Sequence, residues 1–117
     1  MYELPGGGVE PYDNGDYMAA AARELREETG YVPGKMLHLG DTYKDSFSNG
    51  TWHVYYATDC TLHPDGQKLD DTEHIEVQLL SIDQLFAKAR QGLVSDAQGV
   101  FLAYERLRAI QEPTAAA

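Results

Sequence analysis

The sequence predicts an α+β (mixed α/β) domain in which helices pack on a sheet. Two observations support this fold class. A strand-like start, an amphipathic helix, several strand-like segments and two closing helices follow one another along the chain. This order is typical of a layered domain that combines both kinds of element. The composition, 43% hydrophobic and 24% charged, is that of a globular protein and argues against a disordered chain.

The N-terminal part predicts a short strand, a loop and a helix. Residues 2–4 are expected to end a strand, and Pro5–Gly8 turns the chain into a polar loop. Residues 17–29 are expected to form the helix, because apolar side chains recur on one of its faces. Polar side chains of the loop can cap this helix, and Gly30 can adopt the positive φ at which helices often end.

Three further segments predict strands. Residues 36–43 and 51–59 contain many β-forming side chains and are joined by the polar segment 44–50. Residues 62–72 carry proline, glycine and aspartate and are expected to form a loop, whereas residues 75–80 predict another strand. These strands supply the sheet on which the helices are expected to pack.

Two helices are expected to close the chain. Ser81 and Ser95 are each followed three residues later by glutamine, which is the spacing of a capping box. The first helix is expected to end near Gly92, and the second presents a broad apolar face. Residues 1–112 are therefore predicted to form a single domain, with a disordered tail at 113–117.

Charge and cysteine content narrow the class of protein. The formal net charge of −10 argues against sequence-independent binding to nucleic acid, which requires a basic surface. An anionic small molecule is compatible with this charge, because bound divalent cations can dominate the local field. Cys60 is the single cysteine, so no internal disulfide can form. The chain has no leader and no long apolar run, so we expect no membrane span and a cytoplasmic location.

Three carboxylates on the predicted helix indicate a cation site. Glu24, Glu27 and Glu28 fall within an arc of roughly 100° on the helix surface. Like charges this close repel one another and weaken a helix, so a bound cation would stabilise it. Carboxylate oxygens suit hard ions such as Mg²⁺ or Mn²⁺, which also bind substrate phosphates. The alternative is a solvated acidic face that Arg23 and Arg26 partly neutralise.

The segment around these glutamates resembles a known signature. Glu3-Leu-Pro-Gly-Gly, followed by Ala-Ala-Ala-Arg-Glu-Leu-Arg-Glu-Glu-Thr-Gly-Tyr at residues 20–31, is similar to the signature of the Nudix hydrolases. Glu73-His-Ile-Glu-Val and Gly92-Leu-Val-Ser-Asp-Ala further resemble the ADP-ribose and nucleotide-sugar diphosphatase branch of that family. The resemblance implies an α/β/α sandwich with a mixed sheet, shortened at its N-terminus because this branch normally has several strands before the position of Glu3.

The resemblance implies hydrolysis of a nucleotide-derived small molecule with Mg²⁺ or Mn²⁺ as cofactor. In such enzymes water attacks a phosphorus of a nucleoside diphosphate linked to another group, as in ADP-ribose or a nucleotide sugar. Two alternatives stay open. One is a Nudix hydrolase of nucleoside triphosphates or dinucleoside polyphosphates. The other is a non-catalytic nucleotide-binding or assembly module derived from such an enzyme.

The same resemblance implies roles for individual residues. Glu24 and Glu28 correspond to the main metal ligands, and Glu27 corresponds to a further ligand that binds directly or through water. The backbone carbonyl of Gly6 corresponds to one more ligand. Arg23 is expected to orient a glutamate, and both Arg23 and Glu27 are counted with the catalytic residues.

The catalytic base is expected on a loop beyond the signature helix, where Glu73 occupies the position that matches the family. A carboxylate within reach of a bound water can take its proton. Asp70, Asp71 and Glu76 are rivals for this role. The structural alternative for Glu73 is a charged residue at the start of a strand.

Two departures from the family pattern bear on the site. Asp13 stands where the signature has its first glutamate, and Arg23 then arrives two residues late. Whether Asp13 or Asp16 replaces that glutamate is left open. The missing strands leave residues 2–4 as an exposed sheet edge, which proteins usually cover or pair. Pairing with a second copy of the chain would cover it, so we expect a homodimer.

Several other side chains allow two interpretations. Aromatic residues of the segment 51–59 could stack on a base or belong to the core; these are Trp52, Tyr55 and Tyr56. The histidines share no spacing typical of a metal site and are expected at the surface or in structural roles; these are His38, His53, His63 and His74. Lys44 could contact a phosphate or remain solvated.

Overall fold

The computed structural model describes residues 1–44, 46–47 and 50–111. Helices and antiparallel sheets are both present, which confirms the predicted α+β fold class. Within these ranges, no helix combines the length and the apolar character that crossing a membrane requires.

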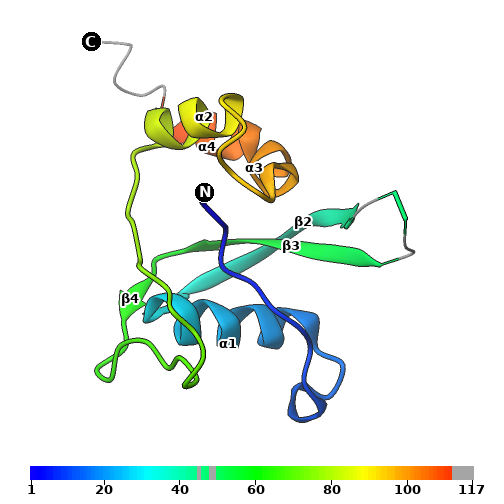
Figure 1. Cartoon of the computed structure of the whole chain (residues 1–117), viewed down its shortest axis with the longest axis vertical. Coiled ribbons are helices and arrows are strands. Elements are labelled where there is room, and N and C mark those ends of the chain that lie inside the picture. The colour runs from blue at the N-terminus through cyan, green and yellow to red at the C-terminus, as the bar shows by residue number, and fades with distance from the viewer. Residues whose placement is uncertain (45, 48–49, 112–117) are drawn as a thin grey trace. The chain divides into compact units, whose positions relative to one another are not determined.

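Two compact units make up the described chain: Pro5–Val77 forms one, and Met1–Leu4 with the segment from Gln78 onward forms the other. The Pro5–Val77 unit combines helical and strand elements (Figure 1). They are η1 (Pro11–Asp13), a 3₁₀ helix, α1 (Tyr17–Thr29), β1 (Tyr31–Val32), β2 (Lys35–Tyr43), β3 (Thr51–Thr58) and β4 (Thr61–Leu62). β2 pairs with β3, and β1 pairs with β4, in both cases antiparallel.

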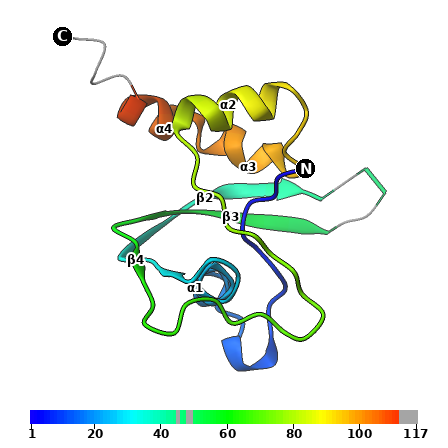
Figure 2. The ribbon, with the colours of Figure 1, turned by 60° about the vertical axis from the view of Figure 1, so that its left-hand side comes forward.

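The predicted acidic helix and both of its ends are confirmed in α1. The Asp16 carboxylate accepts a hydrogen bond from the Ala19 amide at 3.0 Å and caps the first turn. Gly30 ends the helix with a φ of 81°, a left-handed conformation that glycine adopts without steric strain. The helix lies beside the β2–β3 hairpin and contacts β3 (Figure 2). A fixed helix therefore carries the three glutamates.

The β2–β3 hairpin confirms the two predicted strands and contains an irregularity that the sequence did not indicate. His38 pairs with Tyr55 and Gly40 pairs with Val54, so Leu39 has no partner residue in the register. Such a β-bulge adds one residue to one strand and shifts the alternation of its side chains. Residues three apart in β2 therefore share a face across the bulge.

The strand predicted at 75–80 is wrong: among the described residues, this segment forms neither strand nor helix. The Ile75 carbonyl instead accepts a hydrogen bond from the Gln67 side-chain amide at 3.2 Å. The same amide donates to the Glu28 carbonyl at 2.6 Å. The Gln67 side chain thus bonds the Ile75 carbonyl, which in a sheet would accept from a neighbouring strand. The β-forming residues of this segment were therefore not sufficient to form a strand. The connection predicted at 44–50 lies partly outside the described residues.

The other unit packs short helices around a small apolar core. Phe86, Val94 and Val100 are buried together, and the rings of Phe86 and Tyr104 lie 5.1 Å apart. Burial of these side chains favours the packed arrangement, because it removes apolar surface from water. The helices of this unit are α2 (Ile82–Arg90), α3 (Ala97–Leu102) and α4 (Tyr104–Gln111).

One predicted helix start in this unit is confirmed, whereas the predicted first strand is not formed. Ser81 and Gln84 make the predicted capping box at the start of α2. Residues 2–4 form no strand; a single parallel bridge joins Tyr2 to Val94. The Tyr2 amide and carbonyl supply the two hydrogen bonds of this bridge. Of the strand edge predicted at residues 2–4, only Tyr2 therefore makes a bridge.

The single closing helix predicted from Ser95 is also wrong, because α3 and α4 are separate helices on either side of Ala103. α3 begins after Asp96 and has no side-chain cap. The Asp96 carboxylate instead accepts a hydrogen bond from the Leu4 amide at 3.0 Å. A contact between residues distant in sequence thus occupies the group that would cap the helix. The tail predicted at 113–117 lies outside the described residues.

Candidate active site

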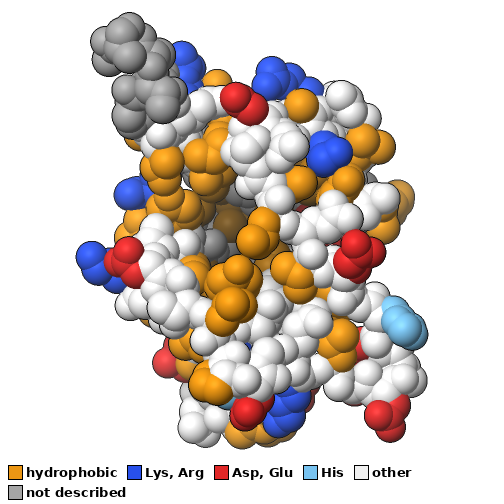
Figure 3. Space-filling model, turned by 90° about the vertical axis from the view of Figure 1, so that its left-hand side faces the viewer, with side chains coloured by type: hydrophobic (Ala, Val, Ile, Leu, Met, Phe, Trp, Pro, Cys, Tyr) orange, Lys and Arg blue, Asp and Glu red, His pale blue; other side chains and the backbone are white. Residues whose placement is uncertain are grey.

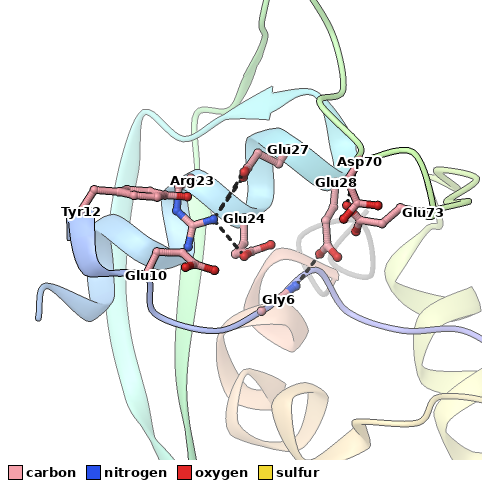
Figure 4. Close-up of a pocket in the computed structure, with 10 residues that line it drawn as sticks. Gly6, Glu10, Tyr12, Arg23, Glu24, Glu27, Glu28, Asp70 and Glu73 are labelled. Atoms are coloured by element: carbon pink, nitrogen blue, oxygen red, sulfur yellow. Dashed lines mark hydrogen bonds and ion pairs between the residues drawn. The ribbon is translucent and has the colours of Figure 1, made fainter. Parts of the chain in front are cut away.

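A cavity of about 300 Å³ in the Pro5–Val77 unit gathers acidic side chains (Figure 4). α1 supplies three of its carboxylates, and the loops before and after this helix supply the others. Its lining residues are Gly6, Gly7, Glu10, Tyr12, Arg23, Glu24, Glu27, Glu28, Asp70 and Glu73. They include all the site residues that the sequence predicts, namely Gly6, Arg23, Glu24, Glu27, Glu28 and Glu73.

Arg23 is the one basic residue among the described residues that line this cavity. Its Nη1 lies 3.0 Å from Glu24 Oε1 and 3.1 Å from Glu27 Oε2. Its Nη2 lies 3.0 Å from Asp13 Oδ2 and donates to the Gly8 carbonyl at 3.0 Å. The hydrogen bond with Asp13 is the main cause that raises the pKa of Arg23. The guanidinium thus offsets the repulsion between two neighbouring carboxylates and fixes their orientation.

Asp13 has a structural role in the loop before α1. Its side chain is only 5% exposed and accepts the Glu10 amide at 2.7 Å in addition to Arg23. The hydrogen bond from Arg23, followed by that from the Glu10 amide, lowers the pKa of Asp13. Neither Asp13 nor Asp16 is among the residues that line the cavity. Asp13 binds Arg23, and Asp16 caps α1.

Glu24 is packed against the glycine-rich loop. A Cβ atom built on Gly7 would lie 2.4 Å from Glu24 Cδ, which is closer than two carbon atoms can approach without displacement. The absence of a side chain at Gly7 therefore makes room for this carboxylate. Burial raises the pKa of Glu24, and the nearby negative charges of Glu27 and Glu73 add to this effect. A neighbouring cation would stabilise the ionised form of this carboxylate.

Glu28 faces the same loop one turn further along α1. Its Oε1 accepts a hydrogen bond from the Gly6 amide at 2.7 Å. The resemblance implied a role for the carbonyl of Gly6, whereas the contact seen here is made by its amide. Glu28 lies beside Asp70 and Glu73 in the cavity (Figure 4). The helix and two separate loops thus direct carboxylates toward one space.

Hydrogen bonds within a tight loop hold Asp70 and Glu73. The Asp70 amide donates to Glu73 Oε1 at 3.0 Å. Asp70 Oδ1 accepts the Thr72 amide at 2.9 Å and the Thr72 hydroxyl at 2.8 Å, and these bonds lower the pKa of Asp70. Of the rivals for the role of base, Asp70 lines the cavity, whereas Asp71 and Glu76 do not.

This loop is anchored to the C-terminal end of α1, a feature that the sequence did not reveal. The Gln67 side chain donates to the Glu28 carbonyl at 2.6 Å, and the Lys68 amide donates to the Glu27 carbonyl at 2.8 Å. The last carbonyls of a helix have no partner within the helix, so they are available for such bonds. The segment that carries Glu73 is therefore positioned by the same helix that carries the other glutamates.

Sequence reasoning gave no site role to three lining residues, Gly7, Glu10 and Tyr12. The Arg23 Cζ atom lies 5.2 Å from the centroid of the Tyr12 ring, which is the distance of a cation–π contact. Glu10 precedes Pro11 at the start of η1. An acidic residue so close to the glycine-rich loop was the available signal for Glu10.

The donor set of the cavity fits a hard divalent cation. Six side chains offer carboxylate oxygens, and no histidine or cysteine is among the described residues that line the cavity; the six are Glu10, Glu24, Glu27, Glu28, Asp70 and Glu73. Mg²⁺ and Mn²⁺ prefer such oxygen ligands. Arg23 supplies one positive charge against these six groups, so the cavity retains a strong negative field.

Other residues considered from the sequence lie elsewhere. Trp52, Tyr55, Tyr56 and Lys44 are not among the residues that line the cavity. The sequence predicts surface or structural roles for the histidines, and the side chains of His38 and His53 are 45% and 28% exposed. Both rings contact the Asp41 carboxylate, at 2.7 Å each. The β-bulge produces this arrangement, and no spacing along the sequence could have indicated it.

The sequence of this chain is similar to those of known proteins. A family model described as the NUDIX domain matches residues 1–102. The chain is 28% identical over 102 residues to an ADP-ribose pyrophosphatase of Bacillus subtilis, covering 86% of this chain and 54% of that protein. It is 36% identical over 93 residues to a CMP-5′-(N-acetyl-N-hydroxy-3-aminopropyl)phosphonate hydrolase of Streptomyces rubellomurinus, covering 78% of this chain and 43% of that protein.

A further relative is an uncharacterised Nudix hydrolase of Schizosaccharomyces pombe, 34% identical over 103 residues, which cover 80% of this chain and 49% of that protein. The chain thus spans about half the length of the curated relatives it matches. The family match covers most of the chain and includes α1 with its three glutamates. The chain therefore belongs to the Nudix domain family.

Proposed function

We propose that this chain catalyses the Mg²⁺-dependent hydrolysis of a nucleoside diphosphate linked to another group, such as ADP-ribose or a nucleotide sugar. The observation that carries the proposal is the convergence of α1 carboxylates and the loop carboxylate Glu73 on one cavity. Six carboxylates with a single arginine form a poor site for an anionic substrate unless cations accompany it.

Glu24, Glu27 and Glu28 would hold Mg²⁺ or Mn²⁺ in this site. When bound, such ions offset the charge of phosphate oxygens and lower the pKa of water. Arg23 bonds Glu24 at 3.0 Å and Glu27 at 3.1 Å, so it acts as a positioning residue for both. The Gly6 amide holds Glu28 in the same way, at 2.7 Å. Arg23 and the Gly6 amide therefore orient all three proposed ligands.

Glu73 is the proposed general base. It accepts the proton of the attacking water while the water oxygen bonds to phosphorus and the bridging P–O bond breaks. The products are a nucleoside monophosphate and a second phosphorylated piece. Asp70 also faces the cavity, but two hydrogen bonds from Thr72 stabilise its ionised form and make it a weaker base.

The names of two relatives favour a nucleotide joined to a second group as the substrate. One relative is named for ADP-ribose and the other for CMP joined to a phosphonate. Nucleoside triphosphates and dinucleoside polyphosphates have no such support among these relatives, so they serve as comparison substrates in the test.

A substrate panel in ¹⁸O-labelled water tests the proposal. ADP-ribose, UDP-glucose, ATP and diadenosine tetraphosphate are each incubated with the protein and Mg²⁺, and products are separated and weighed by mass spectrometry. We expect AMP and ribose 5-phosphate from ADP-ribose, with ¹⁸O in a product phosphate because water attacks phosphorus. Faster turnover of ATP than of ADP-ribose would overturn the substrate class. Nucleotide binding without any turnover would instead identify a non-catalytic module.

We also propose that two copies of the chain associate. Large hydrophobic side chains are exposed, and the face drawn in Figure 3 shows hydrophobic side chains among the polar ones. Among them are Tyr43, Leu62, Leu79 and Phe101, at 70%, 67%, 76% and 80% exposed. A contact that buries such side chains removes apolar surface from water, which favours association. Light scattering should give twice the mass of the chain at micromolar concentration; the mass of a monomer would contradict the proposal.

A further inference from the structure

The two strands of the β2–β3 hairpin bring two histidines and one aspartate to the same face. Asp41 and His53 are direct partners in the antiparallel register. In a regular strand His38 and Asp41, three residues apart, would point to opposite faces. The β-bulge between His38 and Gly40 adds one residue and reverses this alternation. His38 therefore joins the other two side chains on one face.

The three side chains converge on one point. His38 Nε2 and His53 Nδ1 each lie 2.7 Å from the same oxygen, Asp41 Oδ1. One ligand atom from each residue lies within 4.8 Å of the others. An aspartate at neutral pH is ionised and can only accept hydrogen bonds, so both ring nitrogens carry their hydrogens toward it. A single cation could bind these two nitrogens in place of their hydrogens, and each neutral ring would then carry its hydrogen on the other nitrogen.

We propose that His38, Asp41 and His53 form a binding site for a divalent transition-metal ion of the Zn²⁺ type. Two imidazole nitrogens and one carboxylate oxygen are ligands that Zn²⁺ accepts readily, whereas Mg²⁺ prefers oxygen alone. None of the three residues lines the acidic cavity. Ligand chemistry therefore separates the two sites, with Zn²⁺ at the hairpin and Mg²⁺ at the glutamates of α1.

The required geometry is close to the arrangement already present. With metal–ligand bonds of about 2.0–2.1 Å, the donors of a tetrahedral Zn²⁺ site lie about 3.3 Å apart. The side chains of His38 and Asp41 are each 45% exposed and that of His53 is 28% exposed, so small rotations can open the cluster. Solvent also reaches the position of the ion, which leaves a fourth ligand site for water.

Neighbouring aromatic rings restrain the two histidines. The Tyr17 ring of α1 stacks on His53 with ring centroids 4.1 Å apart, and Tyr55 lies 5.0 Å from His38. Such packing reduces the rotamer freedom that metal binding would otherwise remove. Because the ligands come from both β2 and β3, a bound ion would link the two strands and stabilise the hairpin.

Calorimetric titration with Zn²⁺ tests the proposal. It is done in excess Mg²⁺, added to fill the proposed site in the acidic cavity, and in a Cys60→Ser background, because Cys60 is an exposed thiol. We expect one Zn²⁺ per chain. Loss of a group behind a metal ligand already weakens binding by about 10- to 100-fold, so His38→Gln and His53→Gln should each weaken it by at least about tenfold. His74→Gln, a change at an exposed histidine outside the cluster, is the matched control.

Two further measurements identify the site and check the fold of the variants. Zn²⁺ should shift the ring ¹⁵N resonances of His38 and His53 and leave those of His74 unchanged. It should also raise the Tm of the parent protein, and this rise should be lost in both cluster variants. Equal Zn²⁺ affinity in His38→Gln, His53→Gln and the parent would overturn the proposal. So would the absence of Zn²⁺ binding to the parent.

Discussion

Arg23 and Asp13 are joined by two parallel hydrogen bonds, from Nη2 to Oδ2 at 3.0 Å and from Nε to Oδ1 at 3.2 Å. This fork ties the loop before α1 to the helix itself. The remaining nitrogen of the same guanidinium holds Glu24 and Glu27. Asp13 stands where the signature has its first glutamate, and the same residue positions Arg23.

Arg23→Lys should preserve the positive charge and lose the fork. A lysine is a point charge and cannot bond Asp13 through two nitrogens while also holding Glu24 and Glu27. We expect kcat to fall about 10- to 100-fold, as for other groups that orient metal ligands, with the fold retained by circular dichroism. Arg106→Lys, at an exposed arginine of α4, is the control and should leave kcat unchanged. A fully active Arg23→Lys would contradict the positioning role.

Asp13 should make stability depend on pH in the acid range. The bond from Arg23 holds the pKa of Asp13 below its ordinary value, so the folded state favours the ionised form. This contribution is fully present above the ordinary pKa of about 3.9 and is lost as the pH falls through the lowered pKa of the folded state. Urea denaturation between about pH 2 and pH 5 measures it.

In Asp13→Asn the free energy of unfolding should fall less steeply below about pH 4 than in the wild type, because the titrating group is gone. Asp71→Asn, a change at an exposed aspartate, is the matched control and should keep the wild-type slope. An unchanged slope in Asp13→Asn would show that the ion pair with Arg23 does not favour the folded state.

Two adjacent glycines should respond differently to alanine. A Cβ at Gly7 would lie 2.4 Å from Glu24 Cδ, whereas a Cβ at Gly8 would meet no atom within 4 Å. Gly7→Ala should therefore displace the Glu24 carboxylate and lower kcat/KM by up to about 100-fold, the scale expected for a shift of about 1 Å. Gly8→Ala should stay near wild-type activity. Equal activity of the two variants would remove Glu24 from the site.

The small core of the helical unit should be sensitive to truncation. Phe86 is 7% exposed and packs with Val94 and Val100. Phe86→Ala should reduce the free energy of unfolding by about 3–5 kcal/mol, because it removes buried apolar surface and leaves a cavity. Arg106→Ala, at an exposed position of α4, should change it by about 0.5 kcal/mol or less. Urea titrations of the two variants measure both values, and similar losses would contradict this assignment of the core.

Local signals predicted the helices best. The cap at Asp16, the left-handed Gly30 and the capping box at Ser81 all depend on residues a few positions apart, and all three are present. The errors arose where distant groups compete for the backbone or for a cap. The Gln67 side chain donates to the Ile75 carbonyl in the predicted strand. The Leu4 amide donates to the Asp96 carboxylate, which would otherwise be free to cap α3.

The same contrast between local signals and long-range contacts applies to the candidate site. The spacing of Glu24, Glu27 and Glu28 follows from helical periodicity, so the sequence alone could place them together. The bonds that orient these groups come from loops whose conformations depend on long-range contacts. The convergence of His38 and His53 on Asp41 depends on a bulge and on strand register, neither of which is encoded by a local pattern.

In our proposal, the carboxylates of α1 make this cavity a Mg²⁺-dependent hydrolytic centre. The most direct measurement is the rate of AMP release from ADP-ribose, with and without Mg²⁺, by the wild type and by Glu28→Gln. Glu105→Gln, at an exposed position of α4, is the control. We predict turnover that requires Mg²⁺ in the wild type and the control, and a loss of at least about 100-fold in Glu28→Gln. Undiminished, Mg²⁺-dependent turnover by Glu28→Gln would contradict the claim.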